Sequence, residues 1–325
     1  MKALFTDHDL LDISLEREIF REAGIELVEA QCRTEDALIA AAQGCSALLV
    51  QYAPVTERVL AARPEIGLCS RIGAGYDTID ARAAERRGVW VANSPDYGVG
   101  EVSTHALAMM LSLIRHIPGY DREIRAGQWH YTTAGRIPRA SELTVGILGL
   151  GRIGKRFAHI ARNVFKRVIA NDPYLIDGDF PAYVERVSQE ELFRQADAIS
   201  IHCLLTDETR GMVDGRLLRL MKPGSYLVNT ARGAVIDIGD LVGVLGEDRL
   251  AGVALDVLPV EPVAAGHPLL SDPRVVLSPH SAFYSAQSEV ELRRKAATNI
   301  VTWMRTGRPD YPVNAGTRKP PGMEA

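Results

Sequence analysis

Three side chains with acid–base or anion-binding chemistry, Arg232, Glu261 and His280, each follow a short β-branched run that is typical of a strand. Parallel strands of an open α/β sheet end at one edge, where such sheets bind ligands, so we expect the three side chains to converge. A guanidinium binds a carboxylate through paired hydrogen bonds and polarises a neighbouring carbonyl. An imidazole can give that carbonyl oxygen a proton, and a carboxylate partner favours the protonated ring. Beside a hydride carrier, this set would suffice to interconvert a 2-oxo acid and a 2-hydroxy acid.

Each of these residues also has a plainer explanation when it is taken alone. Arg232 could be a surface charge, Glu261 a turn carboxylate beside prolines, and His280 a cap at the end of a strand. Their shared placement after successive strands, beside a nucleotide-binding loop, favours the chemical interpretation.

The nucleotide-binding loop is the segment Gly149-Leu150-Gly151-Arg152-Ile153-Gly154, which has the pattern GxGxxG. It directly follows the apolar run Val145–Leu148 and leads into an amphipathic stretch, which is the context that a dinucleotide-binding turn requires. The first glycine permits a tight turn, the second lets a pyrophosphate approach the backbone, and the third lets helix and strand pack closely. Asp172, at the end of the next predicted strand, would accept the ribose hydroxyls and repel a 2′-phosphate, which favours NAD over NADP. The alternative is a packing turn with an N-capping aspartate.

The elements that must position these residues alternate between short β-branched runs and amphipathic segments, which is typical of βα units and parallel sheets. The strands predicted in the first hundred residues are Ala3–Thr6, Glu26–Val28, Ala47–Val50, Ile66–Cys69 and Val89–Ala92. Those predicted from residue 143 onward are Val145–Leu148, Val168–Asn171, Ala198–Ile201, Tyr226–Asn229, Val253–Leu255 and Val275–Leu277. The sequence therefore predicts an α/β protein with two doubly wound domains, each Rossmann-like or flavodoxin-like.

Four helices, a linker and a terminal tail complete the predicted organisation. Helices are expected over Leu15–Ala23 and Glu35–Ala42, and a longer one over Glu101–Ile117, stopped by Pro118-Gly119 and followed by a linker from Gly127 to Ser141. A last helix, Val290–Met304, precedes a Pro/Gly/Lys tail that we expect to be too polar to pack. This helix is too short to form a domain by itself, so we expect it to pack against one of the two predicted domains.

Composition excludes several classes of protein. The 325 residues carry 37 basic and 41 acidic side chains without a basic block, which argues against nucleic acid and anionic lipid as partners. The densest apolar stretch, His105–Ile114, is about half of the ~20 residues that a membrane span needs. Acidic residues close to the amino terminus argue against a secretory signal. The four cysteines and the histidines have no metal-ligand spacing, so we expect reduced thiols, a cytoplasmic location and no metal site.

Ordered motifs over residues 45–312 resemble the D-isomer-specific 2-hydroxyacid dehydrogenase family. The matching blocks are Gly149–Gly154, Leu227–Gly233, Gly252–Val257 with Glu261-Pro262, Ser278-Pro279-His280, and Arg71–Asp80, which is similar to the family's substrate-carboxylate loop. The resemblance implies an NAD-dependent oxidoreductase of D-2-hydroxy acids, in which Arg232 orients the substrate, His280 is the acid/base and Glu261 is its partner. It also implies a substrate domain of residues 1–100 plus 290–325, a cofactor domain of residues 101–289 entered by the helix 101–117, and a homodimer formed through that helix.

The same resemblance assigns further residues to the two ligands. Ala74 and Gly75 would donate backbone N–H groups to the substrate carboxylate, with Arg71 and Phe283 beside the substrate. Besides the glycine loop and Asp172, the residues implied at the cofactor are Cys203, Thr209, Thr230, Ala231, Arg232, Asp256 and His280.

Within the family the chain is most similar to the C-terminal-binding protein and phosphoglycerate dehydrogenase-like branch, on Asn171–Leu175 and His280–Ser285. It departs from the former at Phe283, where tryptophan is usual, and at Val102, where threonine is usual. Because that branch includes transcriptional corepressors, an NAD(H)-sensing scaffold is an alternative to an enzyme. A nucleotide-binding domain without turnover is a second alternative.

Overall fold

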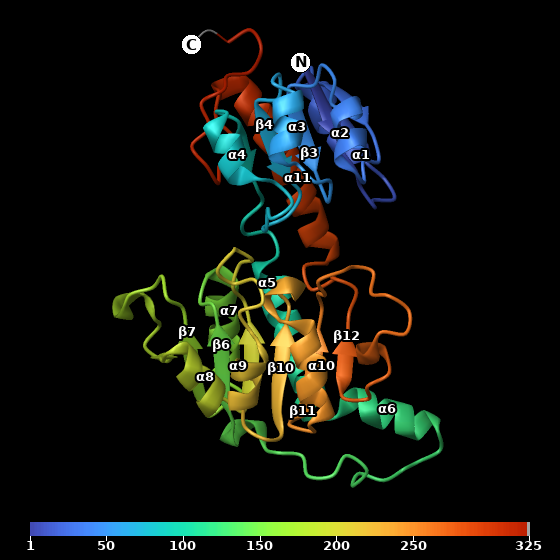
Figure 1. The fold of residues 1–325 in the computed structure, drawn as a ribbon, viewed down its shortest axis with the longest axis vertical. Coiled ribbons are helices and arrows are strands. Elements are labelled where there is room, and N and C mark those ends of the chain that lie inside the picture. The colour runs from blue at the N-terminus through green and yellow to red at the C-terminus, as the bar shows by residue number, and fades with distance from the viewer. Residues whose placement is uncertain (324–325) are drawn as a thin grey trace. The chain divides into compact units, whose positions relative to one another are not determined.

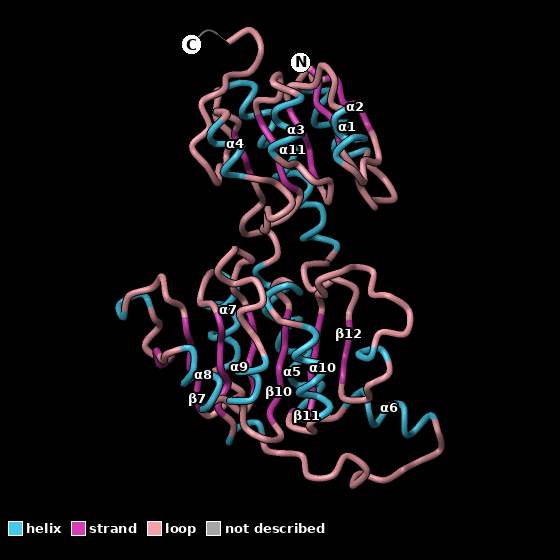
Figure 2. The backbone as a smooth tube through the Cα atoms, viewed as in Figure 1, coloured by secondary structure: helices cyan, strands magenta, loops and turns pink. Residues whose placement is uncertain are grey.

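The computed structural model describes residues 1–323, which form two compact units (Figure 1). One unit comprises Met1–Tyr97 and the chain from Ser285 onward, and the other comprises Gly98–Tyr284. Each contains a single parallel sheet with helices beside it (Figure 2), so the expected α/β class is confirmed. Among the helices of residues 1–323, none has the length and apolar character needed to cross a membrane.

The first unit, which we call the terminal unit because both ends of the chain contribute to it, has a five-stranded sheet. Its strand order is β2-β1-β3-β4-β5, the flavodoxin-like order. The strands are β1 (Lys2–Phe5), β2 (Glu26–Glu29), β3 (Ala47–Val50), β4 (Leu68–Arg71) and β5 (Trp90–Ala92), and the helices are α1 (Ser14–Glu22), α2 (Glu35–Ala41), α3 (Glu57–Ala62), α4 (Ala81–Arg86) and α11 (Ala286–Thr306). All four residues of β3 are fully buried, as expected for a parallel strand covered on both faces.

Helix α11 returns to the terminal unit, as the resemblance implied. The hydroxyl of Ser285 caps its first turn, and Gly307, with φ of 77°, ends it. The guanidinium of Arg293 forms an ion pair of 2.7 Å with the fully buried Glu16 of α1 and also donates to the backbone oxygen of Asp12. One turn further along the helix, the Ser70 hydroxyl of β4 donates to the backbone oxygen of Ala296.

The expectation that the polar tail after α11 would not pack is wrong. The backbone N–H of Val313 donates to the Val91 oxygen of β5, and Pro312 pairs with Ala92 in an antiparallel bridge. The indole N–H groups of Trp90 and Trp303 both donate to the backbone oxygen of Arg318 at 3.1 Å. The tail thus covers the outer edge of the sheet through backbone hydrogen bonds, which do not require an apolar sequence.

The second unit, which we call the nucleotide unit, has a seven-stranded parallel sheet in the order β12-β11-β10-β9-β6-β7-β8. Its strands are β6 (Thr144–Leu148), β7 (Arg167–Asn171), β8 (Glu185–Arg186), β9 (Ala198–Ile201), β10 (Ser225–Asn229), β11 (Leu250–Leu255) and β12 (Val275–Leu277). Its helices are α5 (Val99–Ile114), α6 (Ile117–Arg125), α7 (Arg152–Ala161), α8 (Gln189–Gln195), α9 (Gly215–Leu220) and α10 (Ile238–Gly246).

Two separate cores lie on the two faces of this sheet. Helices α8, α9 and α10 pack on one face through Leu192, Leu217 and Leu241, and helices α5 and α7 pack on the other through Met110 and Phe157. The chain runs from β6 outward to β8 and then crosses back to β9 on the other side of β6. This reversal makes the carboxyl ends of β6 and β9 the position where such sheets bind nucleotides.

Two details of the nucleotide unit differ from the prediction. Six strands were expected, and the seventh, β8, has two exposed residues, so it lacks the apolar pattern that marks a strand. The helix expected over residues 101–117 ends at Ile114, because His116 adopts φ of 55° and Pro118 lies in the first turn of α6. Proline is tolerated in a first turn, where its missing N–H has no intrahelical partner to lose.

Candidate active site

The predicted glycine loop connects β6 to α7. Gly149 has φ of 92°, and a Cβ there would lie 2.6 Å from the backbone nitrogen of Cys203, just beyond β9. A Cβ on Gly154 would lie 2.2 Å from the Gly149 oxygen, so this position also excludes a side chain. At Gly151 a Cβ would meet no atom within 4 Å, so the protein leaves open space beside this backbone. The open backbone at the amino end of α7, whose first residues are Arg152 and Ile153, matches a pyrophosphate cradle.

Asp172 lies directly beyond β7 and faces this loop. Its carboxylate accepts hydrogen bonds from the backbone N–H of Leu150 at 2.9 Å and of Tyr174 at 3.1 Å. The carboxylate is therefore fixed beside the glycine loop. Carboxylate oxygens can accept further hydrogen bonds, which a ribose diol would supply.

The other residues implied at the cofactor follow β9 and β10. Burial raises the pKa of the Cys203 thiol to about 11, so the thiol stays protonated and unreactive. The Thr209 hydroxyl donates to the backbone oxygen of Leu204 at 2.6 Å and so shapes its own loop. The Thr230 hydroxyl is buried without a hydrogen-bond partner in the described chain, and the Ala231 N–H donates to the Asn229 side chain. A buried, unpaired hydroxyl at this edge fits a polar ligand group.

His202, between β9 and Cys203, packs beneath the residues at the carboxyl end of β9. Its Nε2 lies 2.9 Å from the Ser200 hydroxyl, and its ring lies 5.1 Å from that of Phe157. Burial lowers the pKa of His202 to about 3, so the ring is neutral at ordinary pH. This histidine packs within the unit, and at neutral pH its ring is not in the imidazolium form that a general acid requires.

His280 and Glu261, which were predicted to interact, do so. The distance between His280 Nδ1 and Glu261 Oε2 is 2.7 Å, and the other carboxylate oxygen accepts the Leu258 N–H at 2.8 Å. Burial acts to raise the pKa of Glu261, but hydrogen bonds from His280 and Leu258 and the charge of Arg232 outweigh burial, so this pKa is lowered. The carboxylate is therefore ionised, and it directs His280 Nε2 away from itself.

A close backbone approach places Arg232 near this pair. Gly233 follows Arg232, and a Cβ there would lie 2.0 Å from the Leu258 carbonyl carbon and 2.4 Å from the Pro259 nitrogen. Only glycine permits the loop that carries Glu261 to pass over the end of β10 in this way. The structure thus brings the three predicted reacting groups to one edge of the sheet.

Asp256 has a role that the sequence did not reveal. It is 2% exposed, and its carboxylate accepts hydrogen bonds from the Ser278 hydroxyl and from the backbone N–H groups of Ser281 and Ala282. These residues flank His280, which adopts a left-handed φ of 52°. Asp256 therefore holds the histidine loop. Its position after a strand was visible in the sequence, but its partners come from a segment that only the fold brings near.

The residues implied at the substrate lie in both units. Arg71 ends β4 in the terminal unit, and its guanidinium lies beside Gly73, whose φ of 151° is a backbone conformation that residues with a side chain rarely adopt. The Asn93 side chain donates to the Ala74 oxygen and fixes the turn that continues to Gly75. Phe283 lies in the nucleotide unit, with its ring centre 6.5 Å from that of His280.

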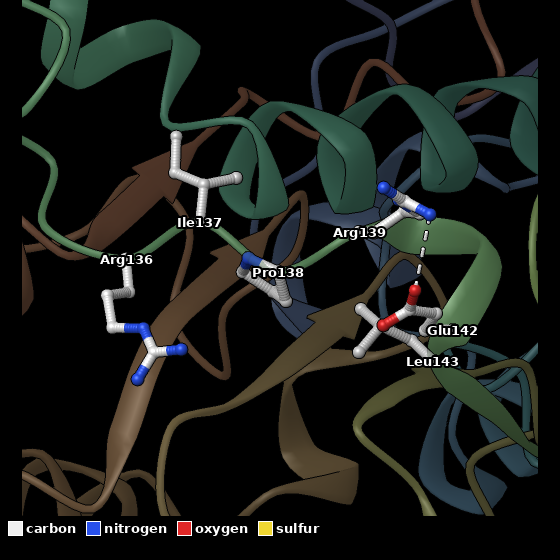
Figure 3. Close-up of a pocket in the computed structure, with 6 residues that line it drawn as sticks. All are labelled: Arg136, Ile137, Pro138, Arg139, Glu142 and Leu143. Atoms are coloured by element: carbon white, nitrogen blue, oxygen red, sulfur yellow. Dashed lines mark ion pairs between the residues drawn. The ribbon is translucent and has the colours of Figure 1, made fainter.

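A cavity of about 350 Å³ lies at the opposite edge of the nucleotide unit, before β6 begins. Figure 3 shows its lining residues, with the ion pair between Arg139 and Glu142 at its rim. It is formed by residues that precede Thr144, whereas the glycine loop follows Leu148, so the cavity is separate from the candidate active site. Over residues 1–323, no cluster of three metal-ligating side chains occurs.

Comparisons with known proteins show the family to which the chain belongs. Residues 107–282 match the family model described as D-isomer specific 2-hydroxyacid dehydrogenase, NAD binding domain. The chain is 34% identical to a glyoxylate reductase from Aeropyrum pernix, over 92% of this chain and 94% of that protein.

Two solved structures are also similar. One is a glyoxylate reductase from Paecilomyes thermophila, with a TM-score of 0.86 and 27% identity over 96% of this chain and 98% of that chain. The other is an NADPH-dependent glyoxylate/hydroxypyruvate reductase from Sinorhizobium meliloti, solved with NADP and malonate, with a TM-score of 0.86 and 25% identity over 100% of this chain and 99% of that chain. Because the family model covers residues 107–282 and the Aeropyrum pernix protein is similar over nearly the whole of both chains, the chain belongs to the D-isomer specific 2-hydroxyacid dehydrogenase family and is an NAD(P)-dependent oxidoreductase.

Proposed function

We propose that the protein interconverts a small 2-oxo acid and the corresponding D-2-hydroxy acid with NAD(H), and that glyoxylate or hydroxypyruvate is among its substrates. The observation that carries this proposal is the 2.7 Å contact between His280 Nδ1 and Glu261 Oε2, in the same unit as the glycine loop. An intact acid–base pair at this edge favours retained chemistry over a scaffold role, although corepressors of this family also keep the set. The names of the similar reductases support the choice of small 2-oxo acids.

In the proposed reaction, a nicotinamide cofactor held at the glycine loop would provide the hydride that the carbonyl carbon receives. His280 donates the Nε2 proton to the carbonyl oxygen, and it takes a proton from the hydroxyl group in the reverse direction. Glu261 holds Nδ1–H, and its negative charge stabilises the imidazolium that exists before proton transfer. Arg232 binds the substrate carboxylate and polarises the carbonyl, because its planar donors fit two oxygens at once.

The terminal unit is proposed to supply the rest of the substrate site. The backbone N–H groups of Ala74 and Gly75 would bind the carboxylate, in a turn that the Asn93 side chain holds in place. Arg71 and Phe283 would border the substituent on the 2-carbon. In this proposal the terminal unit is the substrate domain and the nucleotide unit is the cofactor domain.

We propose NAD rather than NADP as the cofactor. The support is the ionised side chain of Asp172, which the Leu150 N–H holds beside the glycine loop, where a 2′-phosphate would meet its charge. Gly151, Arg152 and Ile153 would hold the pyrophosphate, and Thr230 would pair its buried hydroxyl with a polar group of the cofactor.

A homodimer in the cytoplasm is also proposed. The support for a dimer is a set of large exposed apolar side chains on α6 and in the loop that follows it: Ile117, Ile124, Trp129 and Tyr131. Trp129 is 84% exposed and Tyr131 is 80% exposed, and large apolar side chains exposed within one short segment favour a protein interface there. The four unpaired cysteines agree with a reducing compartment.

The test is NADH oxidation against a panel of 2-oxo acids that includes glyoxylate, hydroxypyruvate, pyruvate, phenylpyruvate and branched-chain acids. We expect turnover with at least one small acid, and His280→Ala should lower kcat by about 10²–10⁴-fold while NADH still binds. His267→Ala, a histidine outside the predicted site, is the control. Full activity of His280→Ala, or no turnover by the wild type with any acid, would overturn the proposal.

A further inference from the structure

A second histidine, His105 of α5, contacts Ser278, one of the residues that hold the loop of His280 in place. Its Nε2 lies 3.1 Å from the Ser278 hydroxyl, which lies 2.5 Å from Asp256 Oδ1. The Ser278 hydroxyl donates to the carboxylate of Asp256, so its single hydroxyl proton points to Asp256. The Ser278 oxygen must then accept from His105, which fixes the proton of the imidazole on Nε2.

The chain of hydrogen bonds continues to the loop that carries His280. Asp256 Oδ1 also accepts the Ser281 N–H at 2.9 Å, and Oδ2 accepts the Ala282 N–H at 3.0 Å. The backbone oxygen of Asp256 accepts the His280 N–H at 2.8 Å. A left-handed conformation disfavours a residue with a Cβ, so His280 keeps it only while these neighbours fix the loop.

We infer that His105 is a positioning residue for the acid/base His280, acting through Ser278 and Asp256. The His105 side chain is 29% exposed and reaches Ser278 from a helix, whereas the residues it supports lie in a loop. A donor on α5 thus ties the loop to a rigid element of the nucleotide unit, and the Met109 sulfur, 3.9 Å from the Ser278 hydroxyl, lies beside this link. The inference rests on the proposed function, because it assigns His280 a proton to transfer.

Two nearly isosteric variants separate the hydrogen bond from the bulk of the side chain. The amide nitrogen of glutamine occupies nearly the position of histidine Nε2, whereas that of asparagine matches Nδ1 and stops short of Ser278. We expect His105→Gln to keep kcat within about twofold and His105→Asn to lower it about tenfold, since small misplacements of a reacting group are costly. The KM for the 2-oxo acid and the Kd for NADH should stay unchanged in both, because neither ligand contacts His105 in this proposal.

The Ser278→Ala variant tests whether His105 acts on His280 through the Ser278 hydroxyl. In that background, His105→Asn should lower kcat by a smaller factor than it does in the wild type, because the Ser278 acceptor is gone and only Asp256 Oδ1, 3.7 Å from His105 Nε2, is left near that nitrogen. Thermal unfolding of each variant is measured alongside to show that the protein is folded. The inference is overturned if His105→Asn retains wild-type kcat, if both His105 variants lose the same activity, or if the loss is unchanged in the Ser278→Ala background. A wild type that oxidises no NADH with any 2-oxo acid instead refutes the proposed function itself, and this inference with it.

Discussion

Replacing Gly151 or Gly154 with alanine adds the same methyl group at two positions of the glycine loop, with opposite expected effects. At Gly154 the new Cβ would lie 2.2 Å from the Gly149 oxygen and 3.1 Å from the Gly149 carbonyl carbon. Both are backbone atoms, so α7 must move away from the loop. Overpacking of this kind costs about 1–3 kcal/mol, and the helical preference of alanine returns about 0.5–1 kcal/mol. We therefore expect Gly154→Ala to lower stability by about 1–2 kcal/mol, or Tm by roughly 2–8 °C.

At Gly151 the same methyl meets no protein atom within 4 Å, and the φ of −70° is one that alanine adopts freely. Stability should change by less than about 0.5 kcal/mol. If this open space receives the pyrophosphate, the methyl must push the cofactor outward, and the Kd for NADH should rise about tenfold or more. The assays are thermal unfolding and a fluorescence titration with NADH. A Gly151→Ala variant that binds NADH with wild-type affinity would refute the assignment of this loop as the phosphate cradle.

Three further predictions concern the same edge of the sheet. Asp172→Asn keeps an acceptor for the Leu150 N–H but removes the charge, so the affinity for NADP relative to NAD should rise about tenfold, and an unchanged ratio would remove Asp172 from the cofactor site. Glu261→Gln should lower kcat/KM about tenfold, since the partly exposed charge-assisted bond between Glu261 and His280 contributes on the order of 1–2 kcal/mol. An unchanged kcat/KM in steady-state kinetics at several pH values would contradict this role of Glu261. Because burial lowers the pKa of His202 from 6.5 to about 3, the unfolded chain takes up a proton below pH 6.5 and the folded chain does not, so stability falls as the pH drops. His202→Gln should remove up to about 2 kcal/mol of the loss between pH 7 and pH 5 in urea unfolding, and an unaltered pH dependence would contradict the burial of this ring.

The sequence was sufficient for those parts of the molecule that depend on local pattern. The buried run Ala47–Val50 is a strand because its β-branched and leucine side chains suit a sheet covered on both faces. Arg232, Glu261 and His280 could be grouped because parallel strands end at a common edge, and their contacts follow from topology. The glycine loop could be found because Gly149 and Gly154 leave no room for a side chain and Gly151 leaves open space between them, a spacing that the sequence shows directly.

Elements that depend on distant partners could not be predicted in this way. Strand β8 is held by its pairing with β7 and has no apolar pattern of its own. The tail packs because its backbone meets β5, and the Trp90 and Trp303 indoles meet the Arg318 oxygen, which no periodicity reveals. The link from His105 to Ser278 joins residues that lie 173 positions apart, so their interaction appears only when the chain is folded.

The construction of the terminal unit from both ends of the described chain sets an order for synthesis on the ribosome. The nucleotide unit is continuous from Gly98 to Tyr284, so it can fold as soon as it emerges. The earlier-made sheet of the terminal unit must wait for Arg293 to pair with Glu16 and for Val313 to meet β5. During that interval the first strands to be translated are the last to be completed, with the edge of β5 open to other chains. Ribosome-bound chains in which residues 98–284 have left the exit tunnel and most of residues 285–323 have not should therefore protect the nucleotide unit from proteases while residues 1–97 remain sensitive.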